Sequence, residues 1–168
     1  MAKKNSVTKY AGFAAILLAL ASIAFMFAPA IVYGSGDDPT TFTAFQTMFG
    51  YTSKTGDRIV VTRTLLDFSF MNLLTLILLA VGIVFSVLKM LSGKNAKLFT
   101  LITTACFIVA GVFLFMTITF TVPHVSENAA EKLFDLSKDS MKLGWGAIVS
   151  AICALIAGAC KLGEFLLG

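Results

Sequence analysis

The chain has 168 residues, of which 58% are hydrophobic and 13% are charged, and its mean hydropathy is +0.91. Soluble domains carry charge on about a quarter of their residues, so this composition excludes an ordinary soluble protein and predicts a membrane protein. The net charge of +4 comes mostly from lysines in short segments beside apolar runs, so we do not expect the protein to bind nucleic acid.

Four apolar runs are long enough to cross a bilayer, which takes about 20 helical residues each. Lipid offers no partners to open backbone groups, so these runs are expected to be helices. The predicted fold class is an all-α membrane protein. Residues 1–168 form one domain, a four-transmembrane-helix bundle with a small extracytoplasmic cap made of a short helix and a β-hairpin. The predicted spans cover about residues 10–32, 68–88, 98–122 and 143–162.

The first run follows several lysines and contains Ala28-Pro29-Ala30, which resembles a signal-peptide cleavage site. Its apolar length exceeds the roughly 7–15 residues of a signal peptide. We therefore predict a retained transmembrane helix over residues 10–32, with Pro29 in its last turn.

Basic residues predict the orientation in the membrane. The N-terminal segment and the 89–97 connection carry lysines and no acids, whereas residues 34–67 and 123–142 mix basic and acidic side chains. We expect a multi-pass plasma-membrane protein with both termini and the 89–97 turn in the cytoplasm. The segments 34–67 and 123–142 are then the outer loops.

Aromatic residues in the first outer loop follow a helical spacing, with Phe42, Phe45 and Phe49 at positions i, i+3 and i+7 and Met48 beside them. Several threonines in the same stretch favour a strand instead. We favour an aromatic-faced helix over residues 40–49.

A turn-forming sequence at residues 53–57 and an Ile/Val-rich run after it predict a small hairpin that pairs residues 51–53 with 59–61. The aromatic residues of this loop have to be buried against another subunit, the chain's own helices or the bilayer surface. The candidate interaction surface consists of Phe42, Phe45, Met48, Phe49 and Tyr51.

The second outer loop reads as a helix over residues 127–141. Its acidic residues recur every four positions, which is typical of a solvated helix face and could also attract cations or a basic partner; they are Glu127, Glu131, Asp135 and Asp139. His124 is the only histidine, and a structural or solvated role is favoured over a metal site because no second strong ligand is evident.

Small residues form a stripe on one face of the first span and another on one face of the fourth. Such stripes let helices approach closely in lipid. We expect one stripe to pack inside the bundle, while the other could join two subunits. The candidate helix-packing residues are Ala11, Ala15, Ala19, Gly146, Ser150, Ala154 and Gly158.

The predicted spans hold little reactive chemistry. Lys89 and Lys161 lie near span ends, from where their side chains can extend toward water. Ion-coupled transporters generally need ionisable groups within the membrane, and HExxH, GxSxG and P-loop motifs do not occur. We therefore expect no catalytic residue, no metal site and no cofactor. The three cysteines, expected to be apolar packing residues without a CxxC pair, are Cys106, Cys153 and Cys160.

The order of spans and loops resembles the tetraspan plan of claudins, in topology only. The tryptophan, the Gly-Leu-Trp and the two cysteines of the claudin outer loop do not occur in residues 34–69, so claudin function does not carry over. The stretches FQTMFGYT and FSFMNLLTLILLAVGIV look more like small uncharacterised four-span proteins of low-GC Gram-positive bacteria. That resemblance implies a fold and no activity.

These features predict a non-enzymatic membrane protein that acts by self-association, or as a subunit of a larger membrane assembly, through its outer loops. The expected partners are the lipid bilayer and copies of itself or other membrane subunits. One alternative is a pore-forming oligomer lined by hydroxyls of Thr103, Thr104, Thr117 and Thr119. Another alternative is a protein that binds a lipid or a small apolar ligand at the Phe42, Phe45 and Phe49 surface.

Overall fold

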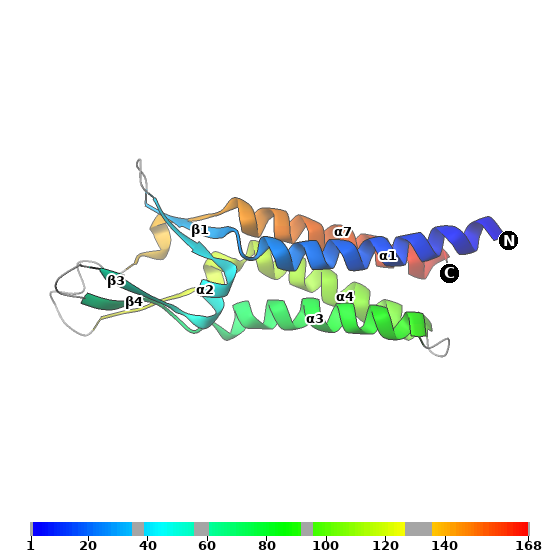
Figure 1. Ribbon diagram of the computed structural model, residues 1–168, viewed down its shortest axis with the longest axis horizontal. Helices are drawn as coiled ribbons and strands as arrows, with labels where there is room; N and C mark the ends of the chain where they lie inside the picture. Colours follow the sequence, from blue (N-terminus) through cyan, green and yellow to red (C-terminus); the bar gives the residue numbers. More distant parts are fainter. Residues whose placement is uncertain (1, 35–38, 56–60, 92–95, 127–135, 168) are drawn as a thin grey trace.

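The computed structural model describes residues 2–34, 39–55, 61–91, 96–126 and 136–167. Figure 1 shows an elongated molecule with long helices along most of its length and strands gathered at one end. The long helices are α1 (Ala2–Phe25), α3 (Phe70–Leu91), α4 (Ala96–Phe115) and α7 (Trp145–Leu167). Helix α7 packs against α1 and α4, and α4 also packs against α3. We call the end with the strands the cap end, and the end with both chain termini the termini end.

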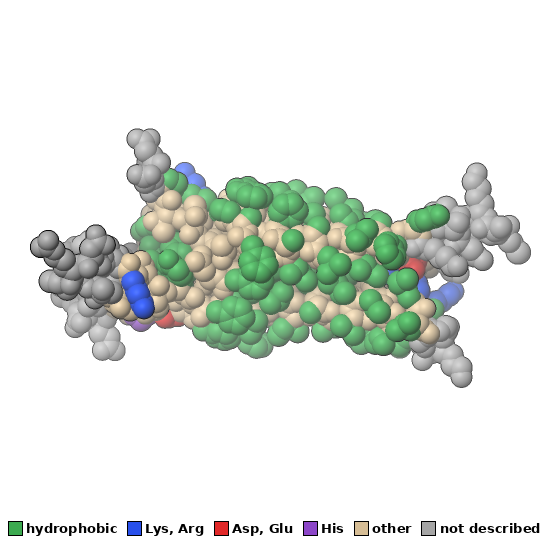
Figure 2. Space-filling model, viewed as in Figure 1, with side chains coloured by type: hydrophobic (Ala, Val, Ile, Leu, Met, Phe, Trp, Pro, Cys, Tyr) green, Lys and Arg blue, Asp and Glu red, His purple; other side chains and the backbone are tan. Residues whose placement is uncertain are grey.

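Three of these helices, α3, α4 and α7, are long and apolar enough to cross a membrane, and α1 has a shorter apolar section, Tyr10–Phe25. On the face in Figure 2, apolar side chains cover the helical middle of the molecule, and lysine and arginine side chains lie only toward its ends. The prediction of a helical protein with membrane-spanning character is confirmed at this level.

The first predicted span, residues 10–32, extends too far. Helix α1 ends at Phe25, and the amides of residues 26–28 bond to carbonyl groups three residues back, which closes a tight last turn. Proline disfavours a helical conformation in the residue before it. Pro29 therefore does not lie in a helical turn but begins strand β1 (Pro29–Tyr33).

The cap contains two three-stranded antiparallel sheets, so the all-α class is wrong for this part of the chain. In the first sheet, β1 lies between β2 (Thr40–Thr43) and β6 (Met141–Leu143). In the second sheet, β4 (Val61–Asp67) lies between β3 (Tyr51–Thr55) and β5 (Val122–Pro123). Each sheet pairs strands that follow α1 with a strand that precedes α7, so the described parts of these two connections fold as one unit.

The predicted helix over residues 40–49 is half right. Residues 40–43 form β2, where the threonines pair with β1, and helix α2 (Ala44–Phe49) follows. Thr43 caps α2: its hydroxyl accepts from the Gln46 amide at 3.2 Å, and the Gln46 side chain accepts from the Thr43 amide at 2.8 Å. Gly50 ends the helix with φ 85°, the left-handed conformation that glycine adopts without strain.

The predicted hairpin is present as β3 and β4, with a longer second strand than expected. Ser53 lies opposite Arg63, and Lys54 belongs to β3 rather than to the turn. The predicted partner strand over residues 59–61 lies outside the described residues except for Val61, which begins β4.

The helix predicted over residues 127–141 is wrong where the structure describes it; residues 127–135 lie outside that part. Lys138–Ser140 form a single 3-10 turn, and Met141 begins β6. The third predicted span, 98–122, also ends early, because Met116 separates α4 from the short helix α5 (Thr117–Phe120).

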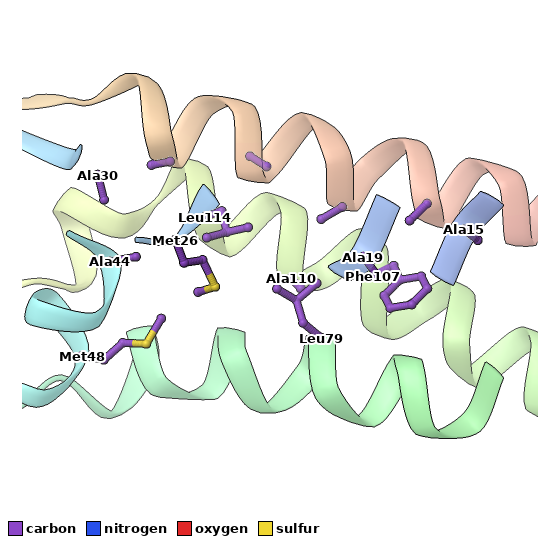
Figure 3. Packing of buried hydrophobic residues seen from close by; sticks show 14 residues of the cluster. Ala15, Ala19, Met26, Ala30, Ala44, Met48, Leu79, Phe107, Ala110 and Leu114 are labelled. Atoms are coloured by element: carbon purple, nitrogen blue, oxygen red, sulfur yellow. The ribbon is translucent and has the colours of Figure 1, made fainter. Parts of the chain in front are cut away.

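The buried core runs from the cap into the bundle (Figure 3). At the cap end, Met48 of α2 and Met26 pack with Leu114 of α4; deeper in the bundle, Leu79 packs with Phe107. The Ala44 amide donates to the Met26 carbonyl at 3.1 Å, which ties α2 to the end of α1. The cap is therefore docked on its own bundle.

Candidate functional site

The functional candidate with the most distinctive chemistry is an ion cluster at the termini end. The Lys89 ammonium of α3 lies 2.7 Å from Oε1 of Glu164, and the Lys161 ammonium lies 3.0 Å from Oε2 of the same carboxylate. The Lys161 side chain is only 1% exposed and that of Lys89 is 19% exposed. The prediction that both lysines extend toward water is therefore wrong for Lys161.

Helix geometry and one glycine bring the cluster together. Lys161 and Glu164 are three residues apart on α7, so they lie on the same helix face. Gly12 of α1 faces the carboxylate: a Cβ atom at this position would lie 3.1 Å from Oε1 of Glu164. A side chain there would crowd the carboxylate that Lys89 and Lys161 bind, so glycine leaves room for Glu164.

A pocket of about 580 Å³ opens beside this cluster. Its floor contains Lys89, Lys161 and Glu164, and Gly12 lies beside them. Its rim is apolar and exposed, and consists of Tyr10, Phe13 and Met90. The site therefore combines charged groups inside with apolar groups at its mouth.

The cluster contains a buried positive charge, the Lys161 ammonium, which needs an opposite charge beside it. Removing an ammonium group from water costs several kcal/mol unless an opposite charge and hydrogen bonds compensate for it. Glu164 supplies both to Lys161, and it also joins α7 to α3 through Lys89. Two ammonium groups and one carboxylate leave the floor with one positive charge in excess.

Sequence reasoning missed Glu164, because the fourth span was predicted to end at residue 162. A signal was present, however. Of the nine acidic residues, Glu164 is the only one outside residues 34–67 and 123–142, and it follows Lys161 at helical spacing. An isolated acid on the lysine-rich side of a membrane protein indicates an ion pair.

The predicted aromatic interaction surface is mostly internal. Phe42 and Met48 are fully buried. Phe45 stacks on Phe27 with ring centroids 4.5 Å apart, and Tyr51 meets Phe42 edge-on at 5.7 Å. Phe49 is the exception, at 59% exposed. This segment is therefore covered mainly by its own chain: Met48 and Phe45 pack with the core that runs into the bundle, and Phe42 packs among the cap strands.

Both small-residue stripes lie inside the chain, which corrects the suggestion that one of them joins two subunits. Ala15, Ala19 and Ala154 are fully buried, as are Gly146 and Gly158, and Ala11 is half-buried.

Helices α1 and α7, which carry the stripes, are also linked by two serines. The Ser22 hydroxyl donates to the Ser150 carbonyl at 2.8 Å, and the Ser150 hydroxyl donates to the Ser22 carbonyl at 2.7 Å. Ser150, a stripe residue, therefore contributes a hydrogen bond within the chain.

Three of the four threonines proposed to line a pore are buried within the chain. Thr104 and Thr117 are buried and donate to carbonyl groups of their own helical turns, at 2.8 and 2.7 Å. Thr103 is also buried, and its hydroxyl has no hydrogen-bond partner in the described structure. Thr119 is exposed. Three of the four residues therefore point into one bundle.

The remaining candidates are the histidine, the cysteines and the acidic stripe. His124, the residue after β5, bonds through Nδ1 to Asp67 at the end of β4 at 2.9 Å. Within the described ranges no group of three or more metal-ligating side chains occurs, and the cysteines are unpaired. Of the acidic stripe, Glu127, Glu131 and Asp135 lie outside those ranges, and Asp139 is exposed.

Comparison with protein-family models, with curated proteins and with solved structures yields no match to this chain. A functional proposal therefore has to come from the geometry of the molecule itself. In the described part of the molecule, the pocket beside Glu164 places buried charged side chains next to an open volume.

Proposed function

We propose that the chain is a plasma-membrane protein that crosses the bilayer four times, with the cap outside and both termini in the cytoplasm. Support comes from α3, α4 and α7, which have the required length and apolarity, and from the apolar section of α1, which packs along α7. The start of α1, the end of α3 and the start of α4 lie at the same end of the bundle (Figure 1), and these parts of the sequence carry lysines. Lysine-rich connections are typical of the cytoplasmic side.

The function that this geometry supports best is non-catalytic binding of an amphiphilic molecule in the pocket at the termini end. The observation that carries the proposal is the pairing of a charged floor with an apolar, exposed rim. Sites for small molecules commonly enclose about 300–1,000 Å³, and the pocket of about 580 Å³ lies in this range. A ligand with a polar group and an apolar chain satisfies both parts of the site.

This proposal moves the ligand-binding alternative away from the aromatic cap residues and to the opposite end of the bundle. The pore alternative is weakened, because the hydroxyls of Thr103, Thr104 and Thr117 are buried within one chain. Leu79, Phe107 and Leu114 fill the space between the helices. These three hydroxyls are therefore not available to line a pore between subunits.

A matched pair of substitutions on α1 tests binding. Phe13 and Leu17 are one turn apart and each is 55% exposed, but only Phe13 lines the pocket. We expect Phe13→Ala to lower lipid affinity about tenfold, since a lost aromatic contact of about 1.5 kcal/mol corresponds to that factor. Leu17→Ala should leave affinity unchanged.

The measurement is native mass spectrometry of the purified chain in detergent, titrated with a mixture of dioctanoyl phosphatidylglycerol and dioctanoyl phosphatidylcholine. Both variants must elute as the wild type does, which checks folding. If Phe13→Ala and Leu17→Ala retain as much lipid as the wild type, the bound lipid belongs to the general annulus and the proposed binding function is wrong.

Assembly with other membrane subunits is a second candidate, favoured by an exposed aromatic patch at the cap end. Phe49 remains exposed beside the start of α3, where Phe68 and Phe70 are exposed as well. The Ser69 amide donates to the Met48 carbonyl at 3.0 Å, which holds these segments together. The patch could face lipid or a neighbouring subunit.

We expect Phe49→Asp to shift an assembly toward monomer by tenfold or more, since a carboxylate placed in an apolar contact is costly. Chemical crosslinking in native membranes, followed by electrophoresis, measures the shift. Lys54→Asp, at an exposed cap position outside the patch, is the control. An unchanged crosslinking pattern for Phe49→Asp would rule this patch out as the contact.

A further inference from the structure

We infer that the ligand of the pocket at the termini end is an acidic phospholipid of the cytoplasmic leaflet, and that its phosphate binds Lys89. This inference rests on the proposed binding function and adds the chemical class of the ligand. It follows from the hydrogen-bonding capacity of the floor, the charge of this end of the chain and the position of the rim.

The two lysines of the floor can donate more hydrogen bonds than the described structure uses. An ammonium group can donate three hydrogen bonds. Within the part of the chain that the structure describes, Lys89 donates to Oε1 of Glu164 and Lys161 donates to Oε2. Lys161 is closed off from solvent, whereas Lys89 is partly exposed at the pocket. Lys89 is therefore the group that can take an incoming oxygen without giving up Glu164.

The charge at this end selects an anion. Two lysines and one glutamate leave the floor at +1, and the adjoining segments of the sequence add lysines and no further acid. These are Lys3, Lys4, Lys9, Lys94 and Lys97. A headgroup whose phosphate has no attached cation would be attracted by this excess positive charge. The positive choline of phosphatidylcholine would be repelled by Lys89, so that headgroup would bind less tightly.

The rim indicates a lipid rather than a free anion. Tyr10 and Phe13 of α1 and Met90 of α3 are exposed at the mouth of the pocket. Helices α1 and α3 make far fewer contacts with each other than either makes with its main neighbour. An acyl chain can therefore lie against the side of the bundle while its headgroup reaches the floor. Acidic lipids are also concentrated in the cytoplasmic leaflet.

The test compares headgroups on the purified full-length chain in detergent. Dioctanoyl phosphatidylglycerol, dioctanoyl phosphatidylcholine and dioctanoylglycerol share the same acyl chains and differ in headgroup charge. Glycerol 3-phosphate supplies the phosphate without the acyl chains. We expect phosphatidylglycerol to bind at least tenfold more tightly than phosphatidylcholine or dioctanoylglycerol, and glycerol 3-phosphate to compete only weakly, at millimolar concentration.

Lysine variants then locate the site. We expect Lys89→Gln to reduce the preference for phosphatidylglycerol to about twofold or less, and Lys89→Arg to retain it. Lys97→Gln removes an exposed lysine at the same end that does not line the pocket, and it should retain most of the preference because its charge acts only from outside the pocket. If Lys89→Gln does not fold, the headgroup comparison on the wild type tests the preference for an acidic lipid. Lys89→Arg and Phe13→Ala then test whether that lipid binds in this pocket.

Each outcome has one meaning. Equal affinity for all three dioctanoyl lipids would overturn the acidic-lipid inference and leave amphiphile binding intact. Competition by glycerol 3-phosphate at the concentration of the lipid would show that the ligand is a soluble anion, which also overturns the inference. An unchanged preference in a folded Lys89→Gln variant would remove the phosphate from this pocket. Binding of none of the lipids would overturn the proposed function itself.

Discussion

Replacing Glu164 by glutamine should lower the free energy of unfolding by about 3–5 kcal/mol, the usual cost of removing one partner of a buried ion pair. Lys161 loses its counter-charge while its side chain stays 1% exposed, so its ammonium group cannot recover hydration. Lys89, at 19% exposed, can turn toward water and loses less. The same change also weakens the link between α3 and α7, because a neutral amide oxygen replaces the carboxylate that Lys89 binds.

Thermal and denaturant unfolding of the purified protein in detergent measures this loss, with Lys97→Gln as the control for removal of one charge at the same end. A double variant, Lys161→Met with Glu164→Gln, should recover most of the stability, because replacing both members of a buried pair is far less costly than replacing one. If Glu164→Gln unfolds as the wild type does, the cluster contributes nothing to folding.

Gly146→Ala should destabilise the protein by about 1–3 kcal/mol, the range for an added methyl group in a tightly packed site. A Cβ atom at residue 146 would lie 2.8 Å from the carbonyl carbon and oxygen of Ala28. These are backbone atoms just before β1, so they cannot turn aside as a flexible side chain would. The chain after α1 would have to move away from α7.

Gly163→Ala in the same helix is the matched control. A Cβ atom there meets nothing within 4 Å, and alanine favours a helix by about 1 kcal/mol over glycine. We therefore expect Gly163→Ala to unfold at the same temperature as the wild type or at a slightly higher one. Equal unfolding temperatures for Gly146→Ala and Gly163→Ala would mean that the approach of α7 to Ala28 does not limit stability.

The helices could be predicted because apolarity and length are properties of a local stretch of sequence. The spans predicted over residues 68–88 and 143–162 lie close to α3 and α7. The cap was harder, since a strand needs partners that are distant in sequence. Strand β1 pairs with β6, more than 100 residues away, and that pairing ends the helix that the apolar run alone would have continued to residue 32.

The candidate site was predicted least well, for a related reason. Hydrophobic spacing indicated that Phe42 and Met48 are buried, but only the packed structure distinguished their own bundle from a neighbouring subunit. Lys89, Lys161 and Glu164 could be read from the sequence as charged residues near span ends. Their meeting depends on how α1 and α4 position α3 and α7 relative to each other, and on the space left by Gly12 of α1.

By itself the sequence determined the apolar, membrane-type composition of the protein, the approximate positions of its long helices without their exact ends, and the lysine-rich character of one end, since these depend on residue type and local spacing. Tertiary structure alone decided that the cap folds back on the bundle, that both small-residue stripes are used within one chain, and that Glu164 joins two lysines beside an open pocket. Each of these depends on contacts between distant segments. Such contacts form only where helices and strands pack closely enough to exclude solvent, and local spacing carries no record of that packing.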